Sequence, residues 1–200
     1  MSGALPTSPA FSELSVESFQ KTIVTRSISG RRQARQVGGQ YWKLTASFPS
    51  MTRADFAPIW AFLIKQRGSF DTFTVTPPVI GTPQGPGGGT PLVDGASQTG
   101  RNIVTDGWPT GGTLTILKAG DFIKFANHTK VYMVTEDATC DTNGDSTISI
   151  EPALLTSPAT DSAITYSSVP FTVYFDGNMV EFSTDHTGVY QFKIDLCEAF

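Results

Sequence analysis

The sequence has few of the residues that build covalent cross-links, metal sites or active sites. It holds two cysteines and two histidines among 200 residues. Two cysteines, Cys140 and Cys197, are too few for a disulfide framework and lack the spacing of a metal site. We therefore expect reduced thiols, no cofactor and no bound metal ion.

Long hydrophobic runs are also absent. No stretch approaches the roughly 20 apolar residues that span a bilayer, and residues 1–15 have neither the charged nor the apolar region of a secretory signal. These absences predict a protein that is not secreted and has no membrane partner. The hydrophobic content of 39% is ordinary for a globular chain and allows a substantial core.

No combination of residues predicts catalysis. His128 and His186 each lie in a polar turn, and neither stands in a pattern with an acid and a nucleophile. The glycine-rich segment 85–89 lacks the lysine and hydroxyl of a phosphate-binding loop, so we interpret it as linker. We predict that the protein is not an enzyme. An esterase or glycosidase reading would require one of the two histidines beside an acid.

Residues 141–146 superficially resemble a calcium-binding loop. The EF-hand pattern requires glycine at its sixth position and glutamate at its twelfth, where this chain has Ser146 and Pro152. The flanking segments also alternate like strands. A hairpin turn with Asn143 and Gly144 at positive φ is the favoured interpretation.

What the sequence does contain is a strand, a helix and a second strand in close succession. Residues 41–48 alternate polar and apolar, which is typical of a half-buried antiparallel strand. Residues 53–67 carry one apolar stripe at helical spacing, formed by Phe56, Ile59, Trp60, Leu63 and Ile64. We expect Phe56 and Trp60 to be buried against the sheet that carries Trp42 and Leu44. Residues 70–76 form the return strand.

The ends of this helix have recognisable signals. Thr52 is the expected N-cap, with Asp55 three residues later, and Gly68 stands where the helix should end. Pro58 breaks the pattern because it lacks a backbone N–H, and it is expected to kink the helix or delay its start.

The remainder of the chain predicts short strands. Four of them, at 113–117, 121–126, 130–137 and 146–152, have the spacing of a small antiparallel barrel or meander. The terminal strand 189–196 alternates again and is expected to pair beside residues 42–48.

The predicted fold is mainly β with one principal α-helix. An antiparallel β-sheet or sandwich packs with the helix and is interrupted by a small inserted β-barrel-like domain. Residues 1–18 are predicted to form an extended N-terminal arm. Residues 19–80 and 169–200 would form the discontinuous sheet-plus-helix domain, and residues 81–168 the inserted β domain with its Gly/Pro-rich linker.

Charge is divided unevenly along the chain. Residues 1–80 hold nine Lys and Arg against four Asp and Glu, a net of +5, whereas the remaining 120 residues hold five against fourteen, a net of −9. Arg31, Arg32 and Arg35 lie in a polar loop or hairpin tip. A solvated loop, a subunit contact and a nucleic-acid contact are the three interpretations of this loop. No aromatic residue lies among the arginines to stack on bases, so we predict an acidic protein surface as partner and no direct nucleic-acid binding.

Aromatic residues offer an alternative function of another class. Trp108 and Tyr132, with Phe122 and Phe125 nearby, have the chemistry of a sugar-stacking platform in a carbohydrate-binding module of an adhesion device. Phe122 and Phe125 fall on opposite faces of a strand, so at most one joins such a platform, and core packing is favoured.

Two segments carry a resemblance to a known family. The segment from Gly39 to Pro77 resembles tail and baseplate proteins of tailed bacteriophages in its strand GGQYWKLTASFP, its helix MTRADFAPIWAFL and its return strand ending in Pro-Pro. Residues 117–155, LKAGDFIKFANHTKVYMVTEDATCDTNGDSTISIEPALL, are similar to the second element of such proteins. Within this class the chain most resembles the distal tail protein, the adaptor between tail tube and baseplate.

The resemblance implies a structural virion protein of the phage tail. It implies a ring oligomer of this chain, formed by the sheet-plus-helix domain and hexameric in the family, that connects the tail tube to the baseplate hub. The implied location is the virion, after assembly in the host cytoplasm. The contact residues expected within this ring are Arg31, Arg32 and Arg35.

Overall fold

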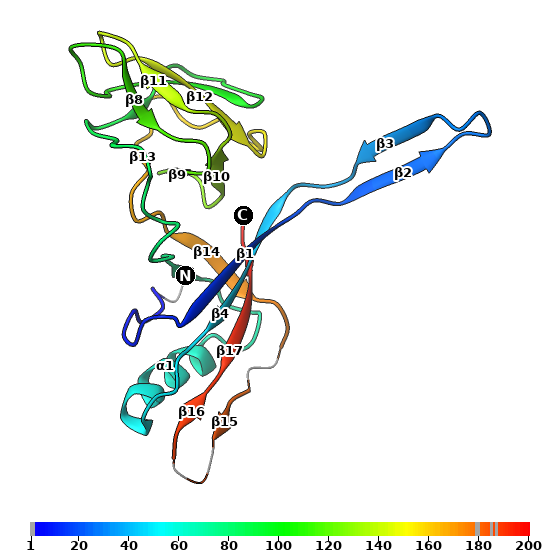
Figure 1. The fold of residues 1–200 in the computed structure, drawn as a ribbon, viewed down its shortest axis with the longest axis vertical. Coiled ribbons are helices and arrows are strands. Elements are labelled where there is room, and N and C mark those ends of the chain that lie inside the picture. The colour runs from blue at the N-terminus through cyan, green and yellow to red at the C-terminus, as the bar shows by residue number, and fades with distance from the viewer. Residues whose placement is uncertain (1–2, 179–180, 185, 187) are drawn as a thin grey trace. The chain divides into compact units, whose positions relative to one another are not determined.

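The computed structural model describes residues 3–178, 181–184, 186 and 188–200. The chain folds into two compact units, Met1–Phe73 with Val173–Glu198 and Thr74–Thr172 with Ala199–Phe200. Strands dominate the described residues, which contain one α-helix, and the paired strands are antiparallel (Figure 1). The predicted fold class is therefore confirmed.

The first unit holds a five-stranded sheet of order β1-β4-β17-β14-β5, the helix and two small hairpins. Its elements are β1 (Glu13–Phe19), β2 (Thr22–Arg26), β3 (Arg32–Gln36), β4 (Tyr41–Ser47), α1 (Arg53–Lys65), β5 (Phe73–Val75), β14 (Phe171–Phe175), β15 (Ser183–Thr184), β16 (Tyr190–Gln191) and β17 (Lys193–Glu198). Strands β5 and β14 carry the chain across the boundaries of the two units.

Strand β4 lies inside this sheet, between β1 and β17. Its side chains alternate between buried and half-buried, and Leu44 and Ala46 have almost no exposed surface. β17 pairs antiparallel with β4, with Leu196 opposite Leu44. The predicted strand at 41–48 and its pairing with the end of the chain are both confirmed.

Helix α1 buries a narrower stripe than the sequence predicts. Phe56, Ile59 and Leu63 are buried, at positions i, i+3 and i+7. Trp60 is half-buried and packs against Phe56, so its predicted burial is met in part. Ile64 is 54% exposed, so its predicted place in the buried stripe was wrong. The helix is rotated so that one edge of the apolar stripe faces solvent.

The ends of α1 agree in part with the sequence signals. Thr52 is the N-cap, but its hydroxyl bonds the Asp55 carboxylate at 2.8 Å and caps no backbone N–H. Pro58 lies inside a helix that begins at Arg53, so it does not delay the start. At the other end Arg67, one residue before Gly68, already has positive φ.

The N-terminal arm is shorter than predicted. Residues 13–18, assigned to an extended arm, instead belong to β1, which pairs along its whole length with β4 from Glu13↔Ser47 to Phe19↔Tyr41. Leu5 is buried as well. The weak alternation of ELSVESF concealed a strand because only Leu14 and Val16 are apolar before Phe19.

The second unit holds an eight-stranded barrel-like sheet. Its strands are β6 (Leu92–Val93), β7 (Asn102–Asp106), β8 (Leu114–Leu117), β9 (Phe122–Phe125), β10 (Val131–Val134), β11 (Ala138–Cys140), β12 (Ser146–Glu151) and β13 (Ile164–Thr165). The path β13-β9-β10-β12-β11-β8 is extended by β7, which pairs with β12 and β6. The four predicted strands are present as β8, β9, β10 and β12.

The glycine-rich segment interpreted as linker is packed against this unit. A Cβ added at Gly85 would lie 2.3 Å from the Ile116 carbonyl oxygen, and one at Gly89 would lie 2.2 Å from the Gly107 oxygen. Side chains at these positions would collide with backbone. The linker prediction was wrong because close backbone contact, which only glycine permits, has the same composition as flexibility.

Asp121 anchors the start of this segment. It is 2% exposed, and its carboxylate accepts backbone N–H bonds from Gln84 (2.7 Å), Gly85 (3.1 Å) and Lys118 (2.8 Å). The Lys118 bond lies within the turn that contains Asp121, whereas the Gln84 and Gly85 bonds come from a segment 36 or 37 residues away. One buried side chain thus joins two segments distant in sequence.

The hairpin predicted at 141–146 is confirmed, but the expected positive φ is found at Gly144 and not at Asn143. Strands β11 and β12 pair at Cys140↔Ser146, and Gly144 has a φ of +89°. The Asp141 carboxylate accepts hydrogen bonds from the backbone N–H groups of Asp145 and Asn143. These bonds lower the pKa of Asp141, and the Asp145 bond has the larger effect. Both cysteines are free, as predicted, and buried in strands β11 and β17.

The burial pattern of α1 gives a first testable result. Phe56→Ala should destabilise the protein by about 3–5 kcal/mol, because a large buried ring that stacks on Tyr190 at 4.5 Å is removed. Ile64→Ala, from the exposed edge of the same stripe, should change stability by less than about 0.5 kcal/mol. Urea unfolding of the two variants measures this difference. Equal losses would contradict the helix rotation described above.

The hydrogen bonds of Asp121 give a second testable result. Asp121→Asn should cost about 1–3 kcal/mol, because an amide presents one acceptor oxygen, in place of two, to the three backbone N–H groups, of which that of Gly85 is buried, and leaves at least one without a partner. The matched control is Asp94→Asn, where the carboxylate is exposed. Urea unfolding should separate the variants, and equal midpoints would show that Asp121 does not hold the segment.

Candidate subunit interface

The predicted arginine loop is the end of a two-stranded hairpin. β2 and β3 pair from Thr22↔Gln36 to Arg26↔Arg32 and form a separate two-stranded sheet. In the sequence this hairpin lies between β1 and β4, and it extends away from the end of that strand pair (Figure 1). Every residue of both strands is exposed. Isolated hairpins of this kind are marginally stable in water, because they have backbone bonds and no core.

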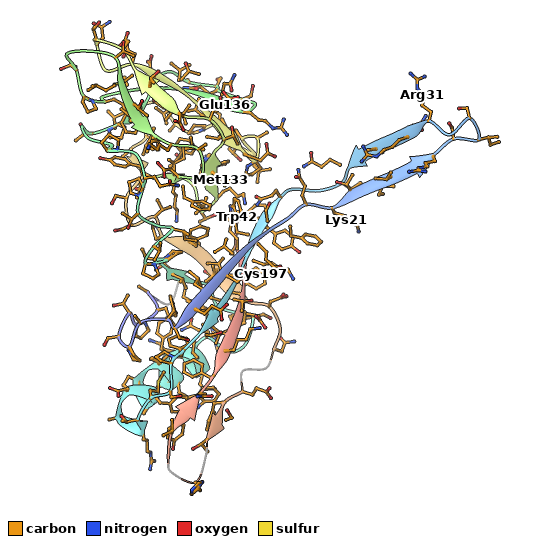
Figure 2. The ribbon with its side chains drawn as sticks, in the orientation of Figure 1. Lys21, Arg31, Trp42, Met133, Glu136 and Cys197 are labelled. Carbon is orange, nitrogen blue, oxygen red and sulfur yellow. The ribbon has the colours of Figure 1, made fainter. Side chains whose placement is uncertain are left out.

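This hairpin is strongly cationic. Residues 20–40 contain five cations and no Asp or Glu. Arg31, Arg32 and Arg35 are all exposed and form no ion pair with the described residues. Figure 2 shows Arg31 at the tip and Lys21 at the base, both projecting outward. The structure thus places all three predicted residues on one projecting element.

The two faces of the hairpin differ. Arg32 lies directly opposite Arg26, a like-charge pair that disfavours the hairpin on its own. Arg35 lies opposite Ile23 on the other face, and Val24 lies opposite Ala34. Ile23 and Val24 are about half exposed and Ile28 is fully exposed. Apolar side chains therefore stand uncovered on both faces.

These apolar residues were missed as interface candidates. The weak alternation of FQKTIVTRSIS predicts one strand over residues 19–29, whereas β1 ends at Phe19 and β2 begins at Thr22. A usable signal was present, since the run TIVT places adjacent apolar residues on opposite faces of one strand.

An aromatic contact and an ion pair hold the part of the sheet next to the hairpin. Phe19 packs on Tyr41, with ring centroids 4.9 Å apart, where β1 and β4 lead into β2 and β3. Lys43 Nζ donates to Asp176 Oδ2 at 2.7 Å, which raises the pKa of Lys43 and lowers that of Asp176. Lys43 is therefore engaged within its own chain, in contrast to the hairpin arginines.

The alternative sugar platform is contradicted by burial. Trp108 is 2% exposed, and Tyr132 has no exposed surface. Trp108 Nε1 donates to Thr105 Oγ1 at 2.8 Å inside the second unit. Phe122 and Phe125 are buried as well. The four aromatic residues are core, as the favoured interpretation predicted, so the alternative of a sugar-stacking platform is contradicted.

Neither histidine is paired with an acid among the described residues. Tyr132 Oη and His128 Nδ1 lie 3.4 Å apart, and His128 Nε2 is buried without a hydrogen-bond partner. His186 is exposed, and its neighbour Asp185 lies outside the described residues. A cavity of about 260 Å³ beside His128 is lined by polar and apolar residues without a carboxylate.

Two further searches of the described residues bear on function. No cluster of three or more His, Cys, Asp or Glu side chains is placed to hold a metal ion. None of the helical segments has the length and hydropathy needed for a membrane span.

The described fold is β-rich and carries an uncovered cationic hairpin, and the comparisons find similarity to a phage tail protein. Residues 82–169 match the family model described as the B domain of the distal tail protein pb9. The chain is also 29% identical over 108 residues to the distal tail protein pb9 of Escherichia phage T5.

This similarity confirms the predicted resemblance to a phage distal tail protein. The match covers 54% of this chain and 52% of the relative, so the chain matches about half the length of its curated relative. The family match lies wholly within the second unit. The hairpin with its three arginines lies outside it.

The partly buried ring of His128 gives a pH prediction. Burial lowers its pKa below the usual 6.5, because desolvation disfavours the charged imidazole. The unfolded chain then binds this proton more tightly, so stability is complete above pH 6.5 and falls as the pH decreases toward the lowered pKa. His128→Asn should remove this part of the acid sensitivity. Urea midpoints at pH 7.5 and 5.0 measure it, and an unchanged difference between the two pH values would contradict it.

Proposed function

We propose that this protein is a structural, non-enzymatic component of a phage tail terminus. In this proposal its copies assemble into a ring, hexameric as in the resembled family, that connects the tail tube to the baseplate hub. The protein is a virion component, assembled in the host cytoplasm. Its partners are further copies of itself, the tail tube and the hub.

One observation of the structure carries the self-assembly in this proposal. The hairpin β2–β3 has no covering layer on either face, exposes Ile23, Val24 and Ile28, and holds five cations without an acid. Such a segment gains little from folding alone, since ordering its residues costs entropy that no burial offsets. A second surface supplies the missing burial and counter-charge.

The charge of the chain favours another copy as that surface. The hairpin is part of a segment of net charge +5, whereas residues 81–200 carry −9. Opposite charges on one chain let identical subunits attract one another head to side, and such heterologous contacts close into rings when the rotation permits. Arg31, Arg32 and Arg35 are the proposed cationic contacts with an acidic subunit or tube surface.

The comparisons support the phage tail part of the proposal. The relative's name describes a distal tail protein, and residues 82–169 match its B domain. The carbohydrate-binding alternative has lost its two proposed contacts, because Trp108 and Tyr132 are buried in the core.

The arginines provide the test. Arg31→Glu, Arg32→Glu and Arg35→Glu together should abolish self-association, whereas each single change should be tolerated, because one exposed ion pair contributes only about 0.2–1 kcal/mol. Light scattering after size exclusion measures the molar mass, which for one chain is 21.5 kDa. Rising salt should weaken the wild-type assembly, since the screening length is about 10 Å at 0.1 M.

The matched control reverses three exposed cations elsewhere, Arg53→Glu, Lys65→Glu and Lys118→Glu. This variant should assemble like the wild type. Normal assembly of the hairpin triple variant would show that the hairpin is a solvated tip and takes no part in the subunit contact. A shift of duplex DNA by the wild type at physiological salt would overturn the choice of a protein partner.

A further inference from the structure

Strand β1 presents an open edge. It is the outermost strand of the five-stranded sheet, and within the described residues it pairs with β4 alone. An open edge of seven residues offers unpaired N–H and C=O groups to any extended segment. Natural edge strands are commonly protected by Lys, Pro or a bulge. β1 contains neither residue, and its register with β4 runs without a shift.

Strand β3 of the hairpin also has an unpaired edge in the described part of the chain. β3 pairs with β2 on one side, and its other edge has no partner among the described residues. β3 is five residues long and is preceded by Arg31, whose carbonyl accepts the N–H of Ser27. The edge of β3 and the edge of β1 are thus two unpaired strand edges on the same chain.

The charges of the two edges have the same spacing. Glu13 and Glu17 lie on one face of β1, opposite Ser47 and Lys43 of β4. Arg31 and Arg35 are also four residues apart and share one face of the hairpin. Neither glutamate forms an ion pair with the described residues. Two strands paired in either direction bring both charge pairs together.

The opposite faces of the edges match as well. Leu14 and Val16 point to the face of β4 that carries Leu44 and Ala46, but they are only half-buried because no strand lies beyond β1. On the hairpin, the face opposite to Arg35 carries Ala34 and Arg32 on the edge strand β3, with Val24 and Arg26 on β2 behind them. A register that pairs the charges on one face therefore brings Ala34 beside one of Leu14 and Val16, and the aliphatic stem of Arg32 beside the other.

We propose that β3 of one copy adds to the open edge of β1 in the neighbouring copy. This inference rests on the proposed self-assembly and names its contact: Arg31 and Arg35 against Glu13 and Glu17, with Ala34 and the stem of Arg32 beside Leu14 and Val16. The net charge of −9 on residues 81–200 attracts the hairpin at long range, whereas the contact itself is made with two acids of residues 1–80. The five-stranded sheet of each subunit then continues into the hairpin of the next. Because the hairpin and the β1 edge are different surfaces, the contact is heterologous and continues from subunit to subunit.

Charge exchange between the edges tests the contact. Glu13→Arg with Glu17→Arg should reduce the molar mass to 21.5 kDa, because arginines then face arginines. Arg31→Glu with Arg35→Glu should do the same. The two double variants mixed in equal amounts should regain the wild-type mass, since every contact in an alternating ring is again between opposite charges. The quadruple variant should assemble alone.

The matched control is Asp94→Arg with Glu136→Arg, two exposed acids outside β1. It should assemble like the wild type, and circular dichroism should show all variants folded. Wild-type mass for the β1 double variant, or failure of the mixture to assemble, overturns the β1 contact while self-assembly stands. A wild-type protein that stays at the mass of one chain at every concentration overturns the proposed function itself.

Discussion

The pairing of β17 with β4 is the interaction on which the first unit depends. Thr45 bonds Asp195 across 150 positions of sequence, so the sheet closes only after the chain has passed through the second unit. The entropy of closing so long a loop grows slowly with its length, and burial of Leu44 and Leu196 along the shared ladder offsets it. Because β4 pairs with β1 on one side and β17 on the other, it holds together strands from both ends of the chain.

The second unit depends on a polar contact instead. The Asp121 carboxylate holds the backbone of Gln84 and Gly85, and a Cβ at Gly85 would collide with the Ile116 carbonyl. A buried carboxylate is tolerated where backbone N–H groups satisfy it, and here three do so. A segment without regular secondary structure is thereby fixed beside the barrel, within the part of the chain that matches the B domain of the phage relative.

Sequence patterns predicted what depends on local period. The alternation at 41–48 predicted β4, and the apolar stripe at 53–67 predicted α1, but a stripe does not say which of its edges is covered, so Ile64 was misplaced. Residues 13–19 were missed because a half-buried edge strand alternates weakly. The ordered glycine segment was missed because its anchor lies 36 residues away. At the candidate interface the arginines were found, but their shared hairpin and its open edge are properties of pairing, which no local pattern contains.

The hairpin differs from the rest of the molecule because its backbone groups are paired while its side chains are not buried. Its five cross-strand pairs satisfy the backbone and bury no side chain, and the Arg26–Arg32 pair opposes the fold. A segment so balanced gains its order from whatever covers it, so hairpin order and association are linked and both increase with subunit concentration. Ile23 and Val24 on opposite faces require burial on two sides, and the surrounding cations select an acidic neighbour. In the proposed assembly, residues that contribute little to the stability of one chain are therefore the ones that join it to the next.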